Sequence, residues 1–359
     1  MFLKFDDAIA ANYQLTFNDI LLEQAAASSL NSRYSSDINP YHRNDFGYYL
    51  DSNTKCLPIV GSPMPSIASP HMMRQLLDAP SKPFAMFADR FRPTQELEEL
   101  YASGCGMTIG LDHSIDDLSD KILTYNIPHV LVDIANGNLD ALVSYLTKLQ
   151  DLRMDEGILL WAGNVTNEYA YSRIAGLVDY VRVGIGGGSA CLTRINTGIG
   201  AGNVTAISRC AQLRKNLMSF GPHTHGTPSP LAHIVADGGI ATNGDICKAL
   251  ACGADLVMLG KMLASTEESA SEAFYEDGHV YKKYAGLASP AYNNKTSIEG
   301  ASGKILLSGS VVDILQGIEG NLRSCMTYTN SKTLEELKSC NKLLCSPTII
   351  SENNTSIMR

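Results

Sequence analysis

Eight short apolar runs alternate with segments of helical periodicity, and this alternation restricts the fold more than any other feature of the chain. The intervening segments place apolar residues at i, i+3 and i+4 and begin near Ser, Thr, Asn or Pro, as amphipathic helices do. Runs that are apolar on both faces are typical of parallel strands covered by helices. The runs span residues 57–64, 83–88, 106–111, 129–135, 157–163, 180–186, 233–239 and 255–261.

Eight strand–helix units predict an α/β fold of the (β/α)8 TIM-barrel type in preference to an open doubly wound sheet. No GxGxxG fingerprint follows the first strand, so the dinucleotide-binding version of the open sheet lacks its signature. The chain has 359 residues, a length that allows one large domain or two modest ones and a full-sized core, so the strand–helix pattern decides between them. We therefore expect a single barrel domain over residues 1–359, with an N-terminal extension and a barrel core at about 57–325.

Two stretches interrupt the alternation. Residues 184–204 form a long glycine-rich loop after the sixth strand, and residues 262–310 form a polar, flap-like insertion after the eighth. Loops that follow the strands of such a barrel carry its active site. We expect 184–204 to be the active-site loop and the insertion to lie on the same face.

Charge and cysteine usage exclude several classes of function. The net charge is −9 and no Lys/Arg cluster occurs, so nothing favours nonspecific nucleic-acid binding. No apolar run reaches the roughly 18 residues of a membrane span, and the N-terminus lacks the apolar core of a signal peptide. The nine cysteines include no CxxC pair, which is typical of free thiols in a reducing compartment. We expect a cytoplasmic protein that binds neither nucleic acid nor membrane.

Cys191 lies within the glycine-rich loop, on the face where a barrel places its chemistry. Bare backbone at Gly184 and at 186–188 lets N–H and C=O groups approach a ligand closely, which suits a phosphate or a cation. A flexible connection with an incidental cysteine is the alternative interpretation. Three further features favour a site.

Two of these features, a set of glycines and an aspartate, lie at the ends of the seventh and eighth strands, where barrels commonly bind phosphate, and the third lies in the cysteine loop. Gly238, Gly239 and Gly260 offer bare backbone there, and Ser189 adds a hydroxyl. Asp237 could accept hydrogen bonds from a ribose diol or could cap the next turn. Together these residues predict a phosphate-containing ligand beside Cys191.

Eight motifs, in a characteristic order, cover most of the chain. They are LTFNDILL (15–22), PIVGSPM (58–64), VDIANG (132–137), AGNV (162–165), VGIGGGSACLTRINTGIG (183–200), VADGGIATNGDICKALACGADLVMLGKMLASTEES (235–269), YAGLAS (284–289) and GSVVDILQGIEGNLRSCMTYTNSKTLEEL (309–337). In these motifs the chain resembles the IMP dehydrogenase / GMP reductase family. The resemblance implies a (β/α)8 barrel, usually a homotetramer, that acts at C2 of a purine nucleotide with NADPH or NAD.

The resemblance also implies roles for individual residues. Cys191 would be the nucleophile that attacks C2, with the Thr193 hydroxyl helping the leaving group or water. Asp133, Ala135 and Asn164 would lie toward the nicotinamide, and the carbonyls of Gly186, Gly188 and Cys191 would bind a potassium ion. The substrate GMP or IMP would be held by Ser62, Met64, Ser189, Asp237, Gly238, Gly239, Gly260, Lys261, Tyr284, Gly286, Leu287 and Glu299.

The chain departs from both branches of the family. The dehydrogenases carry an Arg-Tyr pair on a mobile flap, but the span before the IEG motif reads only PAYNNKTS, and no CBS modules are inserted. The reductases carry a Glu where Pro290 stands here, and proline cannot transfer a proton. Pro65 and the FADRFR stretch (87–92) also differ from the family pattern.

Three activities remain open from the sequence. Reduction of GMP by NADPH to IMP and ammonia is favoured by chain size, the missing flap pair and the VDIANG motif. NAD-dependent oxidation of IMP to XMP is supported by the GSVVDILQ and IEG motifs. A purine-nucleotide-binding paralogue with altered or lost turnover is the third, although a phosphate cradle alone would need neither Cys191 nor Thr193.

Overall fold

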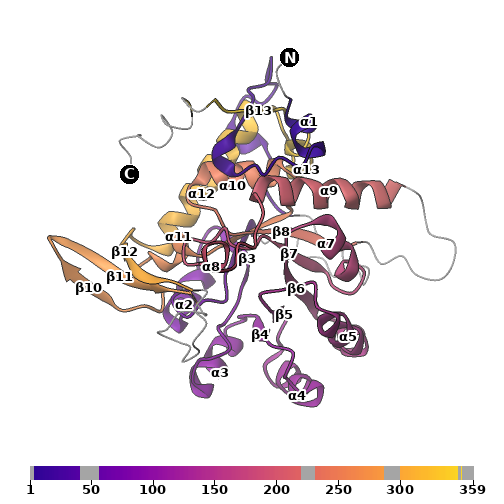
Figure 1. Cartoon of the computed structure of the whole chain (residues 1–359). Coiled ribbons are helices and arrows are strands. Elements are labelled where there is room, and N and C mark those ends of the chain that lie inside the picture. The colour runs from indigo at the N-terminus through magenta and orange to yellow at the C-terminus, as the bar shows by residue number, and fades with distance from the viewer. Residues whose placement is uncertain (1–3, 41–55, 220–230, 287–299, 347–348, 350–359) are drawn as a thin grey trace.

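The computed structural model describes residues 4–40, 56–219, 231–286, 300–346 and 349. All eight expected strands are present, and they form one parallel sheet (Figure 1). They are β2 (Cys56–Gly61), β3 (Lys82–Met86), β4 (Met107–Ile109), β5 (His129–Asp133), β6 (Leu159–Val165), β7 (Tyr180–Val183), β8 (His233–Asp237) and β9 (Leu256–Leu259).

The sheet closes on itself. Its strand order is β3-β2-β9-β8-β7-β6-β5-β4, so β3 and β4 are the two ends. A parallel bridge between Phe87 and Gly106 joins these ends. The Gly106 N–H donates to the Met86 carbonyl at 2.7 Å, and the Ala88 N–H donates to the Gly106 carbonyl at 3.0 Å. The predicted (β/α)8 barrel is therefore confirmed.

Helices surround the strands and cover their outer faces (Figure 1). Local sequence starts several of them, as at α2, where Ser69 accepts from the Met72 N–H at 2.9 Å and Pro70 occupies the first position. The described helices are α1 (Phe5–Ala10), α2 (Pro70–Leu77), α3 (Thr94–Ala102), α4 (Ile115–Tyr125), α5 (Asp140–Lys148), α6 (Gln150–Glu156), α7 (Glu168–Ile174), α8 (Thr193–Thr197), α9 (Asn203–Ser219), α10 (Asn243–Ala251), α11 (Lys261–Ala264), α12 (Val311–Tyr328) and α13 (Leu334–Leu337).

Alternation along the strands divides the core into two parts. Side chains of one parity face the helices, and those of the other fill the barrel interior, since successive strand residues point to opposite faces. Trp161 stacks on Tyr180 in the interior, with ring centroids 3.9 Å apart, and Phe84 packs against both. Asp133, on β5, shares its strand parity with Leu131 of this interior cluster, so its side chain also points inward at the end of its strand.

The insertion after β9 contains regular secondary structure, although its polar composition suggested a loop. It contains a three-stranded antiparallel sheet of β10 (Ala273–Glu276), β11 (His279–Ala285) and β12 (Ser302–Leu306), which projects from the barrel (Figure 1). Asp277 and Gly278 link β10 to β11 with φ angles of 50° and 81°. Two positive φ angles at an Asp-Gly pair are typical of a two-residue hairpin turn, which explains why this polar segment forms strands.

A small sheet and two 3-10 turns complete the described elements near the N-terminus. Strand β1 (Ile20–Leu22) pairs antiparallel with β13 (Lys342–Leu344), so the N-terminal extension packs beside the strand that follows α13. The 3-10 turns are η1 (Phe17–Asp19) and η2 (Arg33–Ser35). Among the described helices, none combines the length and the apolar character needed to cross a membrane.

Candidate active site

A cavity of about 500 Å³ opens at the carboxyl ends of the barrel strands. Its volume lies in the range of about 300–1,000 Å³ typical of small-molecule sites. Most of the residues singled out from the sequence line it, although they come from strands and loops far apart in the chain. They are Ser62, Met64, Asp133, Ala135, Asn164, Gly186, Gly188, Cys191, Thr193, Asp237, Gly238, Tyr284 and Gly286.

The other expected residues do not line the cavity or are not described. Ser189 is exposed and does not line the cavity, but its Oγ donates to the Tyr284 hydroxyl, which does, at 3.3 Å. Gly260 lies close to the same hydroxyl, because a Cβ placed on it would come within 3.2 Å of that oxygen. Gly239 packs against Asn203, and Lys261 is exposed at the start of α11. Leu287, Pro290 and Glu299 lie outside the described residues.

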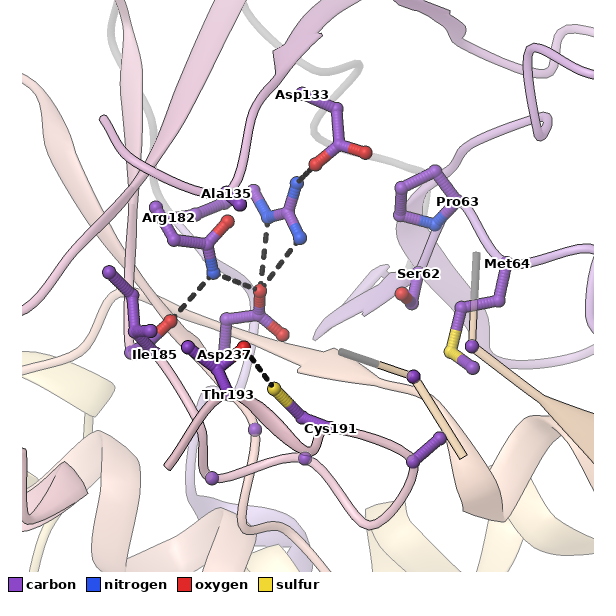
Figure 2. A pocket seen from close by; sticks show the side chains of 18 of the residues that line it. Ser62, Pro63, Met64, Asp133, Ala135, Arg182, Ile185, Cys191, Thr193 and Asp237 are labelled. Atoms are coloured by element: carbon purple, nitrogen blue, oxygen red, sulfur yellow. Dashed lines mark hydrogen bonds and ion pairs between the residues drawn. The ribbon is translucent and has the colours of Figure 1, made fainter. Parts of the chain in front are cut away.

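Cys191 occupies a short ordered turn between strand β7 and helix α8. Its N–H donates to the Gly188 carbonyl at 3.0 Å, and its Sγ lies 3.2 Å from Thr193 Oγ1 (Figure 2). Thr193 begins helix α8, which Gly198 ends with a φ of 72°. The thiol is half-buried at the cavity wall, within reach of a ligand and beside a hydroxyl that can exchange protons with it.

Close backbone packing holds the cysteine loop in place. A Cβ on Gly184 would lie 2.0 Å from the Asp237 carbonyl oxygen, so the two strand ends approach as only glycine allows. The Asn203 amide donates to the Gly238 carbonyl beneath the loop. On the other side Cys191 forms an antiparallel bridge with Gly300 of the inserted segment. The insertion thus forms part of the site.

Hydroxyl groups gather at one end of the cavity. The Tyr284 hydroxyl lies 3.3 Å from Ser189 Oγ and 3.9 Å from Met64 Sδ, and buried Ser62 lines the adjacent wall. Burial raises the pKa of Tyr284, the Ser189 hydrogen bond lowers it, and Asp237 raises it further. Because the net shift is upward, the phenol stays protonated and can donate a hydrogen bond to an anion.

A buried guanidinium joins two carboxylates at the floor of the cavity. Arg182 Nε and Nη2 donate to Asp237 Oδ2 at 3.1 and 2.8 Å, and its Nη1 donates to Asp133 Oδ1 (Figure 2). Asn164 Nδ2 also donates to Asp237 Oδ2, at 2.6 Å, and to the Gly184 carbonyl at 2.7 Å. The capping role considered for Asp237 is wrong, because Thr242 and Asp245 form the capping box of α10.

The positive charge of Arg182 and the negative charges of Asp133 and Asp237 stabilise one another. Burial by itself lowers the pKa of Arg182, but the Asp237 and Asp133 carboxylates outweigh it and hold that pKa above its usual value. Arg182 therefore stays charged although only 7% of it is exposed. No hydrogen bond to Asp237 Oδ1 or Asp133 Oδ2 occurs among the described residues, so each carboxylate keeps an oxygen for a ligand.

Several lining residues were missed from the sequence. Arg182 had a readable signal, because a charged residue of the same parity as Tyr180 in an apolar strand must face the barrel interior and needs counter-charges there. Arg90 and Phe91 line the cavity from the FADRFR stretch, noted only as a departure. The Arg90 guanidinium lies 4.9 Å from the Phe91 ring centroid, and its Nη1 donates to the Asp133 carbonyl at 2.8 Å.

Comparison with known proteins identifies relatives of this chain. A family model described as "IMP dehydrogenase / GMP reductase domain" matches residues 93–354. A GMP reductase of Shewanella pealeana is 32% identical over 350 residues, covering 92% of this chain and 94% of that protein. A GMP reductase of Vibrio vulnificus is 38% identical over 229 residues, or 61% of this chain and 60% of that protein. An inosine-5'-monophosphate dehydrogenase of Nitrosopumilus maritimus is 32% identical over 251 residues, covering 65% and 50%.

Proposed function

Because the chain belongs to the IMP dehydrogenase / GMP reductase family and is an oxidoreductase of that family, we propose that it acts on a purine nucleoside monophosphate at C2 of the base. The observation that carries this proposal is the position of Cys191, half-buried at the cavity wall with its sulfur 3.2 Å from the Thr193 hydroxyl. A thiol beside a proton-exchanging group can add to an electrophilic carbon and later leave it.

The favoured reaction is reduction of GMP to IMP with release of ammonia. Two relatives named GMP reductase support it, and one of them aligns over nearly its whole length. Cys191 Sγ forms a bond to C2, and the bond from C2 to the exocyclic amine breaks. The amine leaves as ammonia with protons from the thiol and from solvent, relayed by Thr193 Oγ1. The C–S bond then breaks as IMP, carrying hydrogen at C2, is released.

The ribose and phosphate of the nucleotide are assigned to groups away from the Cys191 sulfur. In this proposal Asp237 Oδ1 accepts from the ribose, since its Oδ2 is taken by Arg182 and Asn164. The phosphate is held by backbone N–H groups and hydroxyls at the Tyr284 end of the cavity. The residues assigned to the phosphate are Ser62, Ser189, Gly238, Gly239, Gly260, Lys261 and Tyr284, and those assigned to the base are Met64, Gly286, Leu287 and Glu299.

A nicotinamide dinucleotide fits the opposite wall, where Asp133, Ala135 and Asn164 line the cavity. Asp133 Oδ2 offers an acceptor to a carboxamide, and the 62% exposed ring of Phe91 offers a stacking surface in the same wall. When bound, NADPH supplies the hydride that replaces the amine at C2. The protein's part is to hold that ring over the purine and to exclude water.

A potassium ion is included in the proposal at the cysteine loop. The carbonyls of Gly186 and Cys191 accept no hydrogen bond among the described residues, and Gly188 accepts one, from the Cys191 N–H at 3.0 Å. Carbonyl oxygens are ligands suited to a hard monovalent cation. The ion would stabilise the turn that carries Cys191.

The family resemblance extends the proposal to assembly and location. We propose one barrel domain per chain and a homotetramer. All nine cysteines are free in the structure, which agrees with a reducing cytoplasm. Gel filtration with light scattering tests the assembly.

The activity is tested with two substrate pairs. The protein is incubated with GMP plus NADPH and, separately, with IMP plus NAD, and the near-ultraviolet absorbance of the reduced nicotinamide is followed. We expect NADPH to be consumed with GMP only. Formation of NADH with IMP would assign the dehydrogenase reaction instead, and silence in both assays despite tight nucleotide binding would overturn the proposed turnover.

A further inference from the structure

Arg182 is the only described side chain that bonds to both carboxylates of the cavity floor. It uses two nitrogens on Asp237 Oδ2, at 3.1 and 2.8 Å, and a third on Asp133 Oδ1. Figure 2 shows its guanidinium between the two, with Cys191 on the Asp237 side and Asp133 on the far side. One planar, rigid group thus spans the distance between two acidic residues that come from β5 and β8.

The two carboxylates face different halves of the cavity in the proposed function. Asp237 neighbours Gly238 and the cysteine loop, whereas Asp133 neighbours Ile134 and Ala135 in the wall proposed for the dinucleotide. Their side chains are 17% and 15% exposed, so each presents a free oxygen to a ligand while the other is fixed by Arg182. A shift of the guanidinium at one carboxylate must change its hydrogen bonds at the other, because a guanidinium is a fixed fork of donors.

We infer that Arg182 is a positioning residue that couples the nucleotide half of the cavity to the dinucleotide half. This inference rests on the proposed function. Arg182 lines the cavity, but its Nε, Nη1 and Nη2 are all directed at the carboxylates of Asp133 and Asp237. It orients Asp237 Oδ1 toward the ribose and Asp133 Oδ2 toward the nicotinamide, so occupancy of one half alters the geometry offered to the other.

The inference predicts a cross-effect between residues that share no ligand. Asp133→Asn weakens the ion pair on Arg182, and GMP affinity should fall at least about twofold although Asp133 lies in the other half. Asp237→Asn should likewise weaken binding of NADP⁺. GMP and NADP⁺ are suitable probes, singly or together, because this pair has no hydride to exchange.

Arg182→Lys tests the bridge itself. An ammonium is a point charge that cannot bond to both carboxylates with the fork geometry, so affinity for GMP and for NADP⁺ should both fall by about tenfold or more. In the Asp133→Asn/Arg182→Lys double variant, the asparagine should add no further loss of GMP affinity. Calorimetric titration measures each affinity, and a thermal melt checks that each variant is folded.

Arg153→Lys is the matched control. Arg153 forms a buried ion pair with Asp179, with Nη2–Oδ1 at 2.6 Å, and neither residue lines the cavity. It should leave both affinities unchanged.

The outcomes separate this inference from the proposed function. If the wild-type protein binds neither GMP nor IMP, the proposed function and the coupling both fail. If the wild type binds GMP but Asp133→Asn leaves that affinity unchanged, or if its effect persists beside Arg182→Lys, only the coupling is overturned. Should Arg182→Lys fail to fold, the cross-effects of Asp133→Asn and Asp237→Asn, which keep Arg182, decide the matter alone.

Discussion

The sulfur of Cys191 lies 3.2 Å from the hydroxyl oxygen of Thr193, two residues along the same loop. Both groups face one cavity, and the turn that carries them is fixed by the hydrogen bond from the Cys191 N–H to the Gly188 carbonyl. The loop therefore presents a nucleophile and a proton relay in a single rigid arrangement.

Cys191→Ala should abolish turnover and leave nucleotide affinity within about threefold, because a covalent step loses its nucleophile while the phosphate and ribose contacts remain. We expect a fall in kcat of about 10⁴-fold or more, as for other catalytic nucleophiles. Steady-state kinetics and calorimetric titration with GMP measure the two quantities. Cys345→Ala, at a half-buried thiol outside the cavity lining, is the matched control. Turnover that survives in the Cys191→Ala variant would rule out covalent catalysis.

Tyr284→Phe should weaken GMP binding by about 10- to 100-fold, since a hydrogen bond to a charged group is worth about 1.5–3 kcal/mol. The phenol is buried and remains protonated, because burial raises its pKa. The same substitution should leave guanosine binding unchanged, as guanosine has no phosphate. Titration of both ligands into both proteins tests this. Equal losses for the nucleotide and the nucleoside would show that Tyr284 does not contact the phosphate.

Gly184→Ala should destabilise the protein by more than about 1 kcal/mol and impair nucleotide binding. Gly184 has a φ of 140°, and an added Cβ would lie 2.0 Å from the Asp237 carbonyl oxygen. Gly188→Ala is the control in the same loop, because its nearest contact would be Cys191 Cβ at 3.6 Å. Denaturant unfolding compares the two. Similar free energies of unfolding would mean that the strand ends are not packed as described.

His129 should make the protein less stable in mild acid. Burial in the barrel interior lowers its pKa from 6.5 to about 4, and its Nδ1 accepts from Trp161 Nε1 at 3.3 Å. Between pH 6.5 and 4, His129 binds a proton in the unfolded chain but not in the folded protein. The free energy of unfolding therefore falls, by up to about 3 kcal/mol at the lower limit.

His129→Gln keeps an acceptor for Trp161 and removes this titration. Denaturant unfolding at several pH values should therefore show a smaller loss for the variant than for the wild type over the same range. Carboxylates titrate in both proteins and cancel in the difference. Parallel curves would contradict a buried neutral imidazole.

The strand positions were predictable, but several details of the elements were not. All eight apolar runs became barrel strands, although the sixth ends at Val183 rather than at residue 186, where the glycine loop begins. Within that loop the segment from Thr193 to Thr197 forms a helical turn that spacing did not reveal. The Asp277-Gly278 pair is a sequence signal for a hairpin turn inside the insertion, but the polar composition of the segment suggested only a loop.

Local sequence determined the alternation of strands and helices, the glycines that permit close approach, and the presence of a cysteine and hydroxyl on one loop, because each depends on residues near one another in the chain. Only the tertiary structure decided which groups meet across the barrel. Asp133, Arg182 and Asp237 come from three strands, and their bonds arise because barrel closure points all three side chains into one space. A charge buried there is stable only with its partners, and partners distant in sequence are set by the fold.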